Sequence, residues 1–181
     1  MNQKEIITSV KAREEILDKI FSYLCGIGIN SVNRFEKFLQ IKESLSDKEY
    51  WVALSFAYTS TDYLGRYYNE INEAFLSNRP YREYLMSEEE TLFLNSLPEG
   101  ITIYRGMFVK DHQVNHFGVS WTLSRKVAEF FATINGRTHN PNKDKRKVYK
   151  KIINKSEVIA YFKERNEYEI IYVEKPVNLI P

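Results

Sequence analysis

The hydrophobic pattern of this chain changes its period once, near residue 97, and this change limits the folds open to it. Before that point apolar residues recur every three or four positions, as they do along one face of an α-helix. After it, short runs rich in β-branched and aromatic residues follow a period of two, which is typical of strands. The pattern predicts an α+β protein in which a helical layer packs on a mixed or antiparallel sheet.

Residues 1–97 are expected to form the helical part. The first helix is predicted from apolar residues at helical spacing, namely Ile6, Val10, Ile16, Ile20 and Leu24. Gly26 and Gly28 end it. Ser46 followed by Glu49 is a capping box, which predicts the start of a later, aromatic-rich helix. The stretches "NEINEAFL" and "REYLMSEEETLFLNSL" are also predicted to be helical, before Pro98.

Residues 98–181 are expected to form the β-rich part. The predicted strands are "ITIYRG", "GVSWTLS", "EVIAYF" and "EIIYV". Between the second and third lies an amphipathic helix, "SRKVAEFFATIN", with Ser124 as its N-cap and Phe131 on its core stripe. With 181 residues, the two parts are predicted to build one domain together.

Composition excludes several classes of protein. The net charge of +2 favours no particular partner, and the one cysteine, Cys25, excludes an internal disulfide. With three histidines, two of them (His112 and His116) in one short segment, no metal site is expected. No apolar run has the length of a signal peptide core or a bilayer span. The expectation is a protein without membrane contact, cytoplasmic or acting inside a host or target cell.

An arginine ends the first predicted strand. In "ITIYRG", Arg105 shares one face with Ile101 and Ile103, and Gly106 follows it. A guanidinium at such a place suits a bidentate grip on phosphate or carboxylate. Glycine would let the backbone approach the bound group. The alternative is an arginine that reaches solvent or pairs with a neighbouring glutamate.

The second strand has a hydroxyl face. In "GVSWTLS", Ser120 and Thr122 lie opposite Trp121, so they could position a ligand or a carboxylate by hydrogen bonds. The alternative is an ordinary half-buried strand with one wet side.

Two carboxylates open the last strand. In "KERNEYEIIYVEK", an extended backbone would put Glu167 and Glu169 on one side, directly before the apolar run 170–173. Burying like charges this close together is unfavourable, so the pair indicates a cleft that needs them. The alternative is an edge strand whose carboxylates are solvated.

The order of these motifs resembles the R-S-E class of NAD-dependent mono-ADP-ribosyltransferases. The matching stretches are "IYRGM", "GVSWTLSRKVAEFFA" and "ERNEYEII", within residues 101–173. "YTSTDYLGRYYNEINEAFL" also looks like the helical region before the catalytic core in bacterial and phage members. The resemblance implies a split β-sandwich that binds NAD as a substrate between two sheets, without a metal. The middle strand departs from the family, because it reads Ser-Trp-Thr where many members have Ser-Thr-Ser.

The resemblance also implies roles for individual residues. Arg105 would bind the NAD phosphates, and the Gly106 backbone would bind the nicotinamide amide. Ser120 and Thr122 would hold the ribose side and orient the carboxylate. Glu169 would be the catalytic glutamate.

Glu167 would govern the acceptor, and a glutamate there resembles the arginine-modifying subset. The expected catalytic set is Glu169, Glu167, Arg105 and Ser120. The turn "YFKERN" would recognise the acceptor through Tyr161, Phe162 and Arg165.

Other functions stay open at this stage. The basic run "NKDKRKVYKK" is either a solvated loop or a docking site for RNA, DNA or an acidic protein surface. Protein arginine is therefore the first expectation for the acceptor, and RNA or DNA is the second. If water is the acceptor instead, the protein would be an NAD glycohydrolase. The non-enzymatic alternative is a basic nucleic-acid-binding or adaptor module. By analogy with small bacterial and phage transferases, the chain would be a toxin or effector with an antitoxin or immunity protein as partner.

Overall fold

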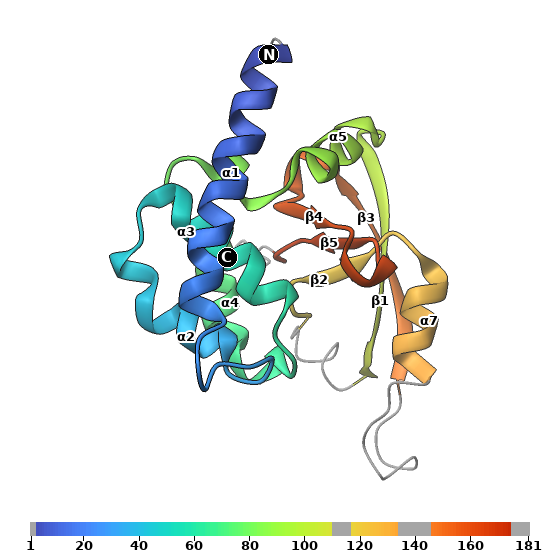
Figure 1. The fold of residues 1–181 in the computed structure, drawn as a ribbon. Helices are drawn as coiled ribbons and strands as arrows, with labels where there is room; N and C mark the ends of the chain where they lie inside the picture. Colours follow the sequence, from blue (N-terminus) through green and yellow to red (C-terminus); the bar gives the residue numbers. More distant parts are fainter. Residues whose placement is uncertain (1–2, 110–116, 134–145, 175–181) are drawn as a thin grey trace, which may run out of the picture. The chain divides into compact units, whose positions relative to one another are not determined.

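A computed structural model describes residues 3–109, 117–133 and 146–174 (Figure 1). The chain divides into two compact units, Met1–Leu92 and Phe93–Pro181. The described residues contain six α-helices and one five-stranded antiparallel sheet, so the protein belongs to the mixed α and β class. Among the described helices, none combines the length and the hydropathy needed to cross a membrane.

The first unit is helical. Its helices are α1 (Gln3–Leu24), α2 (Arg34–Ile41), α3 (Asp47–Thr59) and α4 (Tyr68–Phe75), and α5 (Glu88–Ser96) begins in it. The first helix ends before the two glycines, as predicted, and Gly28 has a φ of +82° that favours glycine. The stretch predicted to be helical from Arg82 onward instead begins with a 3₁₀ turn, Arg82–Leu85, and becomes α-helical only at Glu88.

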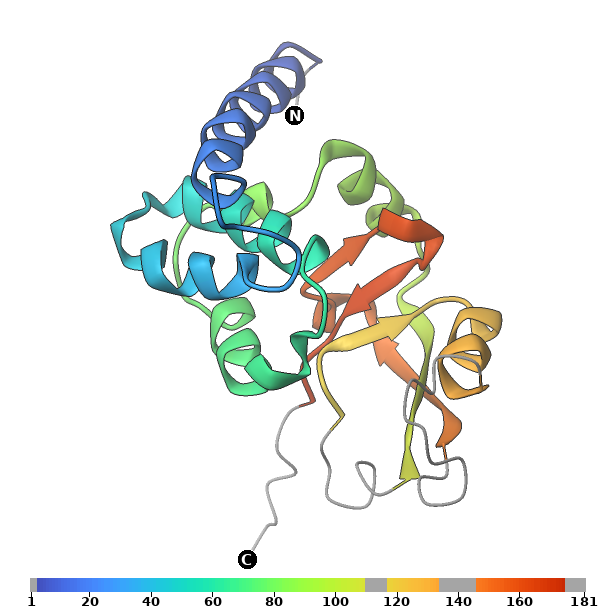
Figure 2. The ribbon, with the colours of Figure 1, turned by 60° about the horizontal axis from the view of Figure 1, so that its bottom comes forward.

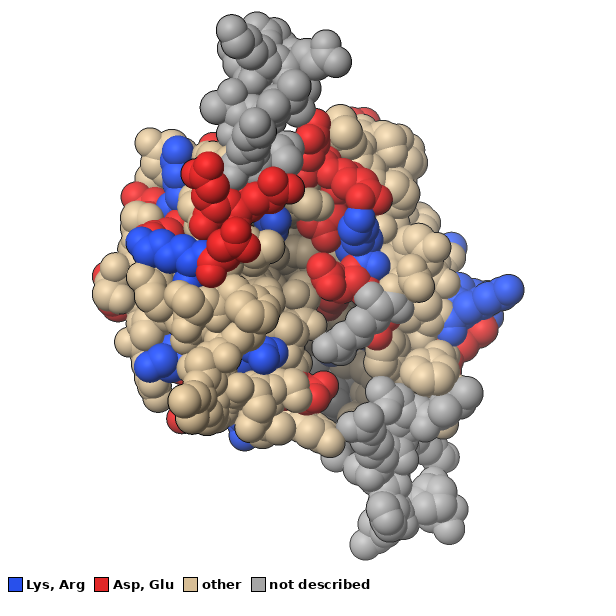
Figure 3. Space-filling model, viewed as in Figure 1, with Lys and Arg blue, Asp and Glu red and all other residues tan. Residues whose placement is uncertain are grey.

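Helix α3 is the core of this unit. It contacts α1 and α2, and its Trp51 and Leu54 are fully buried. Tyr58 is buried as expected for a core aromatic, whereas Tyr63, just beyond the helix, is 64% exposed. Acidic side chains gather on the outer face of α1, where Glu14, Glu15 and Asp18 are exposed (Figure 3).

The capping box at the start of α3 is confirmed. The Glu49 carboxylate accepts hydrogen bonds from the Ser46 backbone N–H (2.9 Å), from the Ser46 hydroxyl (2.7 Å) and from Lys19 of α1. The bond from Lys19, followed by that from Ser46, lowers the pKa of Glu49 from 4.5 to about 2. One carboxylate thus caps α3 and also ties it to α1.

Replacing Glu49 with glutamine is expected to destabilise the protein at pH 7 but not near pH 2. Because the pKa of Glu49 is lowered by folding, its charge stabilises the native state above pH 4.5, and this stabilisation disappears as the pH falls to about 2. Urea unfolding of Glu49→Gln and of the native chain across this range measures the difference. Glu73→Gln, at an exposed position of α4, is the control, and a difference that does not vary with pH would contradict the assignment.

The second unit is built on the sheet, whose strand order is β3-β1-β2-β5-β4. The strands are β1 (Gly100–Phe108), β2 (Ser120–Thr122), β3 (Arg146–Asn154), β4 (Ala160–Phe162) and β5 (Glu169–Ile171). Helix α7 (Arg125–Thr133) lies alongside β1 in both views (Figures 1 and 2). Buried residues from the central strands, including Ile103, Trp121 and Ile170, form the core.

Strand β3 was missed by the sequence reading. The basic run at 142–151 was expected to be a solvated loop or a docking site, but all nine residues from Arg146 to Asn154 pair with β1. Lysines at positions 147, 150 and 151 obscured the strand signal of the β-branched and aromatic residues among them.

Helix α7 is held close to the sheet by two contacts within residues 128–132. At Gly106 of β1, an added Cβ would lie 2.2 Å from the Ala128 carbonyl oxygen and 2.6 Å from the Ala132 nitrogen. Arg146 Nη1 of β3 donates to the Phe131 carbonyl at 2.9 Å, near the end of the helix. The helix backbone therefore packs directly on the strand, and only glycine fits there.

Candidate functional site

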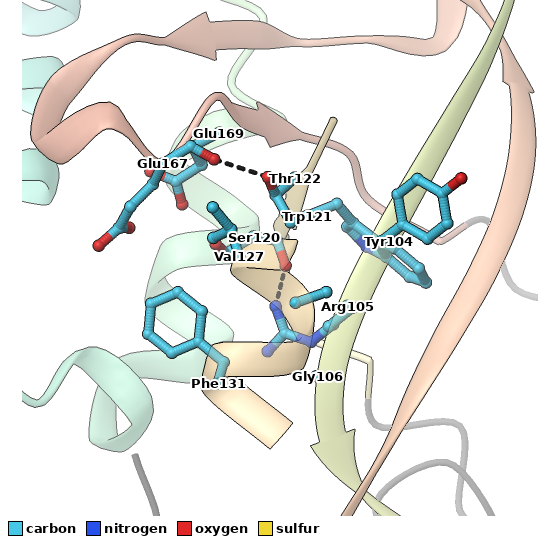
Figure 4. Close-up of a pocket in the computed structure, with 11 residues that line it drawn as sticks. Tyr104, Arg105, Gly106, Ser120, Trp121, Thr122, Val127, Phe131, Glu167 and Glu169 are labelled. Atoms are coloured by element: carbon cyan, nitrogen blue, oxygen red, sulfur yellow. Dashed lines mark hydrogen bonds between the residues drawn. The ribbon is translucent and has the colours of Figure 1, made fainter. Parts of the chain in front are cut away.

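A pocket of about 210 Å³ opens in the second unit (Figure 4). Its walls come from β1, β2, α7, the start of β5 and the turn before β5. The lining residues are Tyr104, Arg105, Gly106, Ser120, Trp121, Thr122, Val127, Ala128, Phe131, Glu167 and Glu169. Pockets that enclose a drug-sized ligand usually measure about 300–1,000 Å³. This pocket would therefore enclose one part of such a molecule and leave the rest outside.

Arg105 reaches across from β1 to β2. The two strands are joined through a single residue pair, Tyr104 with Thr122. Beyond that pair, Arg105 Nη1 donates a hydrogen bond to the Ser120 carbonyl oxygen (Figure 4). Its guanidinium lies against Gly118, whose φ is +62° and where an added Cβ would lie 2.7 Å from Arg105 Nη2. The arginine head is therefore fixed in the pocket wall by main-chain groups of the β2 segment.

Thr122 links β2 to the turn that carries Glu167. Its side chain is only 6% exposed, and its hydroxyl donates to the Glu167 carbonyl oxygen at 2.6 Å. The same hydroxyl accepts from the Ser124 N–H at 3.0 Å, directly before α7. Because its one proton is committed to the main chain, Thr122 positions the turn. Ser120, in contrast, is partly exposed.

Replacing Thr122 with valine is expected to lower the free energy of unfolding by about 1–3 kcal/mol, because the hydroxyl's hydrogen bonds to the Glu167 carbonyl and from the Ser124 N–H are lost. Denaturant unfolding measures the change. Thr122→Ser keeps the hydroxyl and is expected to retain most of the stability. Equal stability of Thr122→Val and the native chain would show that the link contributes nothing.

The two carboxylates share the pocket for a different reason from the one predicted. Glu167 is not in a strand: it follows the 3₁₀ turn Glu164–Asn166 with a φ of −88° and a ψ of −10°, and β5 begins only at Glu169. Between them Tyr168 has a φ of +49°, which is rare for a residue with a side chain. The turn, rather than the alternation of a strand, brings both side chains to the pocket (Figure 4).

Cross-strand pairing places Glu169 beside the hydroxyl strand. Glu169 is paired with Thr122 of β2 on one side and with Phe162 of β4 on the other. Directly paired residues of antiparallel strands project to the same face, so Glu169 and Thr122 lie on the pocket side of the sheet. Six of the predicted residues, from segments up to 64 positions apart, line this one pocket: Arg105, Gly106, Ser120, Thr122, Glu167 and Glu169.

The predicted acceptor contacts need correction. Tyr161 and Phe162 belong to strand β4 and are only 4% and 1% exposed, and the Tyr161 ring stacks on Phe93 with centroids 4.4 Å apart. They are core residues and present no surface to an acceptor. The Arg165 side chain lies outside the described part of the structure, as do His112 and His116.

Phe131 was predicted to be a core residue but lines the pocket. It is partly exposed on α7, one turn beyond Val127, which also lines the pocket. The helical spacing of the two residues in "SRKVAEFF" was visible in the sequence. The sequence did not reveal that this stripe covers a cavity as well as the sheet.

The pocket combines charged groups of both signs with an apolar wall. Two carboxylates and a guanidinium meet around a space bounded by Val127 and Phe131. Within the described residues, no three His, Cys, Asp or Glu side chains are grouped closely enough to hold a metal.

Searches of protein-family models, curated proteins and solved structures found no match for this chain. The fold and the pocket are therefore the basis on which its function is inferred.

Proposed function

We propose that this protein is an NAD-dependent mono-ADP-ribosyltransferase of the R-S-E class, with protein arginine as its first acceptor. One observation carries the proposal. Three motifs that are far apart in the sequence line the same pocket. They contribute Arg105, Ser120–Thr122 and Glu167–Glu169.

The shape of the pocket supports NAD as a substrate. Its volume of about 210 Å³ would take the nicotinamide and its ribose, with the adenosine half lying outside. Nicotinamide in NAD is a flat cation, and the Phe131 ring and the two carboxylates are suitable neighbours for it. Arg105 lines the pocket, and its permanently charged, planar guanidinium is the kind of group that binds phosphate.

The split β-sandwich implied by the resemblance is part of this proposal. The described strands form one five-stranded sheet, in which β1 and β2 are joined by a single residue pair.

In the proposed reaction the bond between ribose C1′ and the nicotinamide nitrogen breaks, and its electron pair leaves with nicotinamide. The ribose becomes an oxocarbenium-like cation, as in glycoside cleavage. Glu169 stabilises this charge, which develops only in the transition state. A guanidine nitrogen of the acceptor then bonds to C1′, and its proton passes to Glu167 and on to water.

Replacing Glu167 with glutamine is expected to separate the two half-reactions. Transfer to a small guanidine such as agmatine should fall by about 10²–10⁴-fold, the usual effect of losing a general base. Nicotinamide release into water should stay within a few fold, since Glu169 is untouched. Both products are measured in one assay with labelled NAD. Equal loss of both would refute this division of labour.

The class of acceptor is tested with labelled NAD and cell lysate. Label removed by protease supports a protein acceptor, and label removed by nuclease supports RNA or DNA. Nicotinamide release without labelled macromolecule indicates a glycohydrolase. Absence of nicotinamide release under all conditions favours the non-enzymatic binding module.

A further inference from the structure

Strand β3 is a long edge of the sheet. It runs for nine residues, Arg146–Asn154, whereas strands in globular proteins are commonly five or six residues long. The strand order β3-β1-β2-β5-β4 puts it at the end of the sheet. One of its edges pairs with β1 along its whole length, and the other faces no further strand of the described sheet. Such an edge is a template for another extended chain.

The side chains along this edge combine charge with an exposed aliphatic group. Lys147 and Lys150 are exposed, and Ile152 is 68% exposed although most isoleucines are buried. Lys151 is different, because it forms an ion pair with Glu174 and its ammonium lies 5.2 Å from the Tyr172 ring centroid. The charge offered to a partner is therefore that of Lys147 and Lys150.

The positions of these residues favour a peptide over a nucleic acid. Lys147 and Lys150 are three residues apart in a strand, so they project from opposite faces. A phosphate backbone is bound by cations that follow one face or groove, which these two do not provide. An extended peptide places side chains on both faces, so it could meet both lysines, and an apolar residue could cover Ile152.

A second copy of this chain is disfavoured as the occupant. Pairing two β3 strands edge to edge would bring the lysines of both copies together, and like charges directly opposite one another destabilise a sheet. Lysines on an edge are a known protection against such pairing. The same lysines attract a strand of opposite charge.

We propose that the outer edge of β3 binds an extended acidic segment of a partner protein by strand addition. Main-chain hydrogen bonds would supply affinity, and carboxylates facing Lys147 and Lys150 would supply selectivity. The proposal concerns a surface other than the pocket and does not depend on the proposed enzymatic activity.

The test uses a fluorescent acidic peptide of the length of β3 and measures its binding by anisotropy. Its glutamates are three positions apart among valines and threonines, so that both faces of the extended peptide carry a carboxylate. In two further peptides, alternate amides are N-methylated, either all those on one edge or all those on the other. Strand addition predicts that one of these peptides fails to bind and the other binds normally, because only one edge pairs with β3. If both bind like the unmodified peptide, strand addition is overturned.

Charge reversal tests the position of the site. The double variant Lys147→Glu with Lys150→Glu is expected to weaken binding about tenfold or more, since it turns two attractions into repulsions. Lys126→Glu, which reverses an exposed lysine on α7, should bind like the native chain. Equal effects of the two variants would overturn the assignment to β3. Tighter binding of a single-stranded oligonucleotide than of the peptide, lost in the double variant, would also overturn it in favour of a nucleic acid.

Discussion

Replacing Glu169 with glutamine is expected to abolish nicotinamide release while leaving the fold intact. Removing a preorganised group that stabilises transition-state charge costs about 10²–10³-fold in rate, and a carboxylate facing a full positive charge should cost at least that much. Glutamine has nearly the same shape, and the backbone of residue 169 keeps its pairing with β2 and β4. The measurement is release of labelled nicotinamide from NAD.

Two controls make this result interpretable. The thermal unfolding midpoint of Glu169→Gln should match that of the native chain, because the carboxylate lines the pocket and is not part of the core. Glu164→Gln, in the exposed 3₁₀ turn nearby, should release nicotinamide normally. Full activity in Glu169→Gln would refute the proposed function, whatever the acceptor.

Replacing Gly106 with alanine is expected to destabilise the second unit far more than the same change at Gly100 of the same strand. The new Cβ would lie 2.2 Å from the Ala128 carbonyl oxygen, 2.6 Å from the Ala132 nitrogen and 3.1 Å from the Phe131 carbonyl carbon. All three are backbone atoms of α7, which cannot turn aside as a side chain can. Overpacking costs about 1–3 kcal/mol and occasionally more, and here the whole helix must shift.

The shift should also be visible in the pocket, because α7 supplies Val127 and Phe131 to its wall. Gly106→Ala is therefore expected to lower the unfolding midpoint and to reduce NAD turnover together. Gly100→Ala, at the start of the same strand, is the matched control, because nothing lies within 4 Å of a Cβ added there. If Gly106→Ala were as stable as Gly100→Ala, the close packing of α7 on β1 would be refuted.

Gly106 was singled out from the sequence for one reason, and the structure gives another reason for a glycine at that position. Gly106 was expected to let the backbone approach a ligand. Its missing side chain is explained first by α7, whose backbone occupies the space that a Cβ would need. The residue does line the pocket, so a ligand contact through its backbone stays a prediction.

The sequence pattern was sufficient to predict the structural features that depend on residues close together in the chain. The end of α1 before Gly26, the capping box of Ser46 and Glu49, and the change from helices to strands near residue 97 could all be predicted. Each depends on groups a few positions apart, so propensity and side-chain period are adequate guides. The residue types suited to a charged pocket, Arg105 and the Glu167–Glu169 pair, were visible for the same reason.

Contacts between distant segments required the folded chain. Strand β3 exists because nine residues pair with β1, some 45 positions earlier, despite its lysines. Tyr161 and Phe162 are buried because β4 packs in the core, and Phe131 lines a pocket because α7 packs on β1 beside that pocket. Glu167 shares that pocket with Glu169 through a left-handed residue and a bond from Thr122. A short stretch of sequence is enough to predict residue type and local conformation. Whether a side chain points into a site depends on strand register and packing, and these involve residues that are distant in the chain.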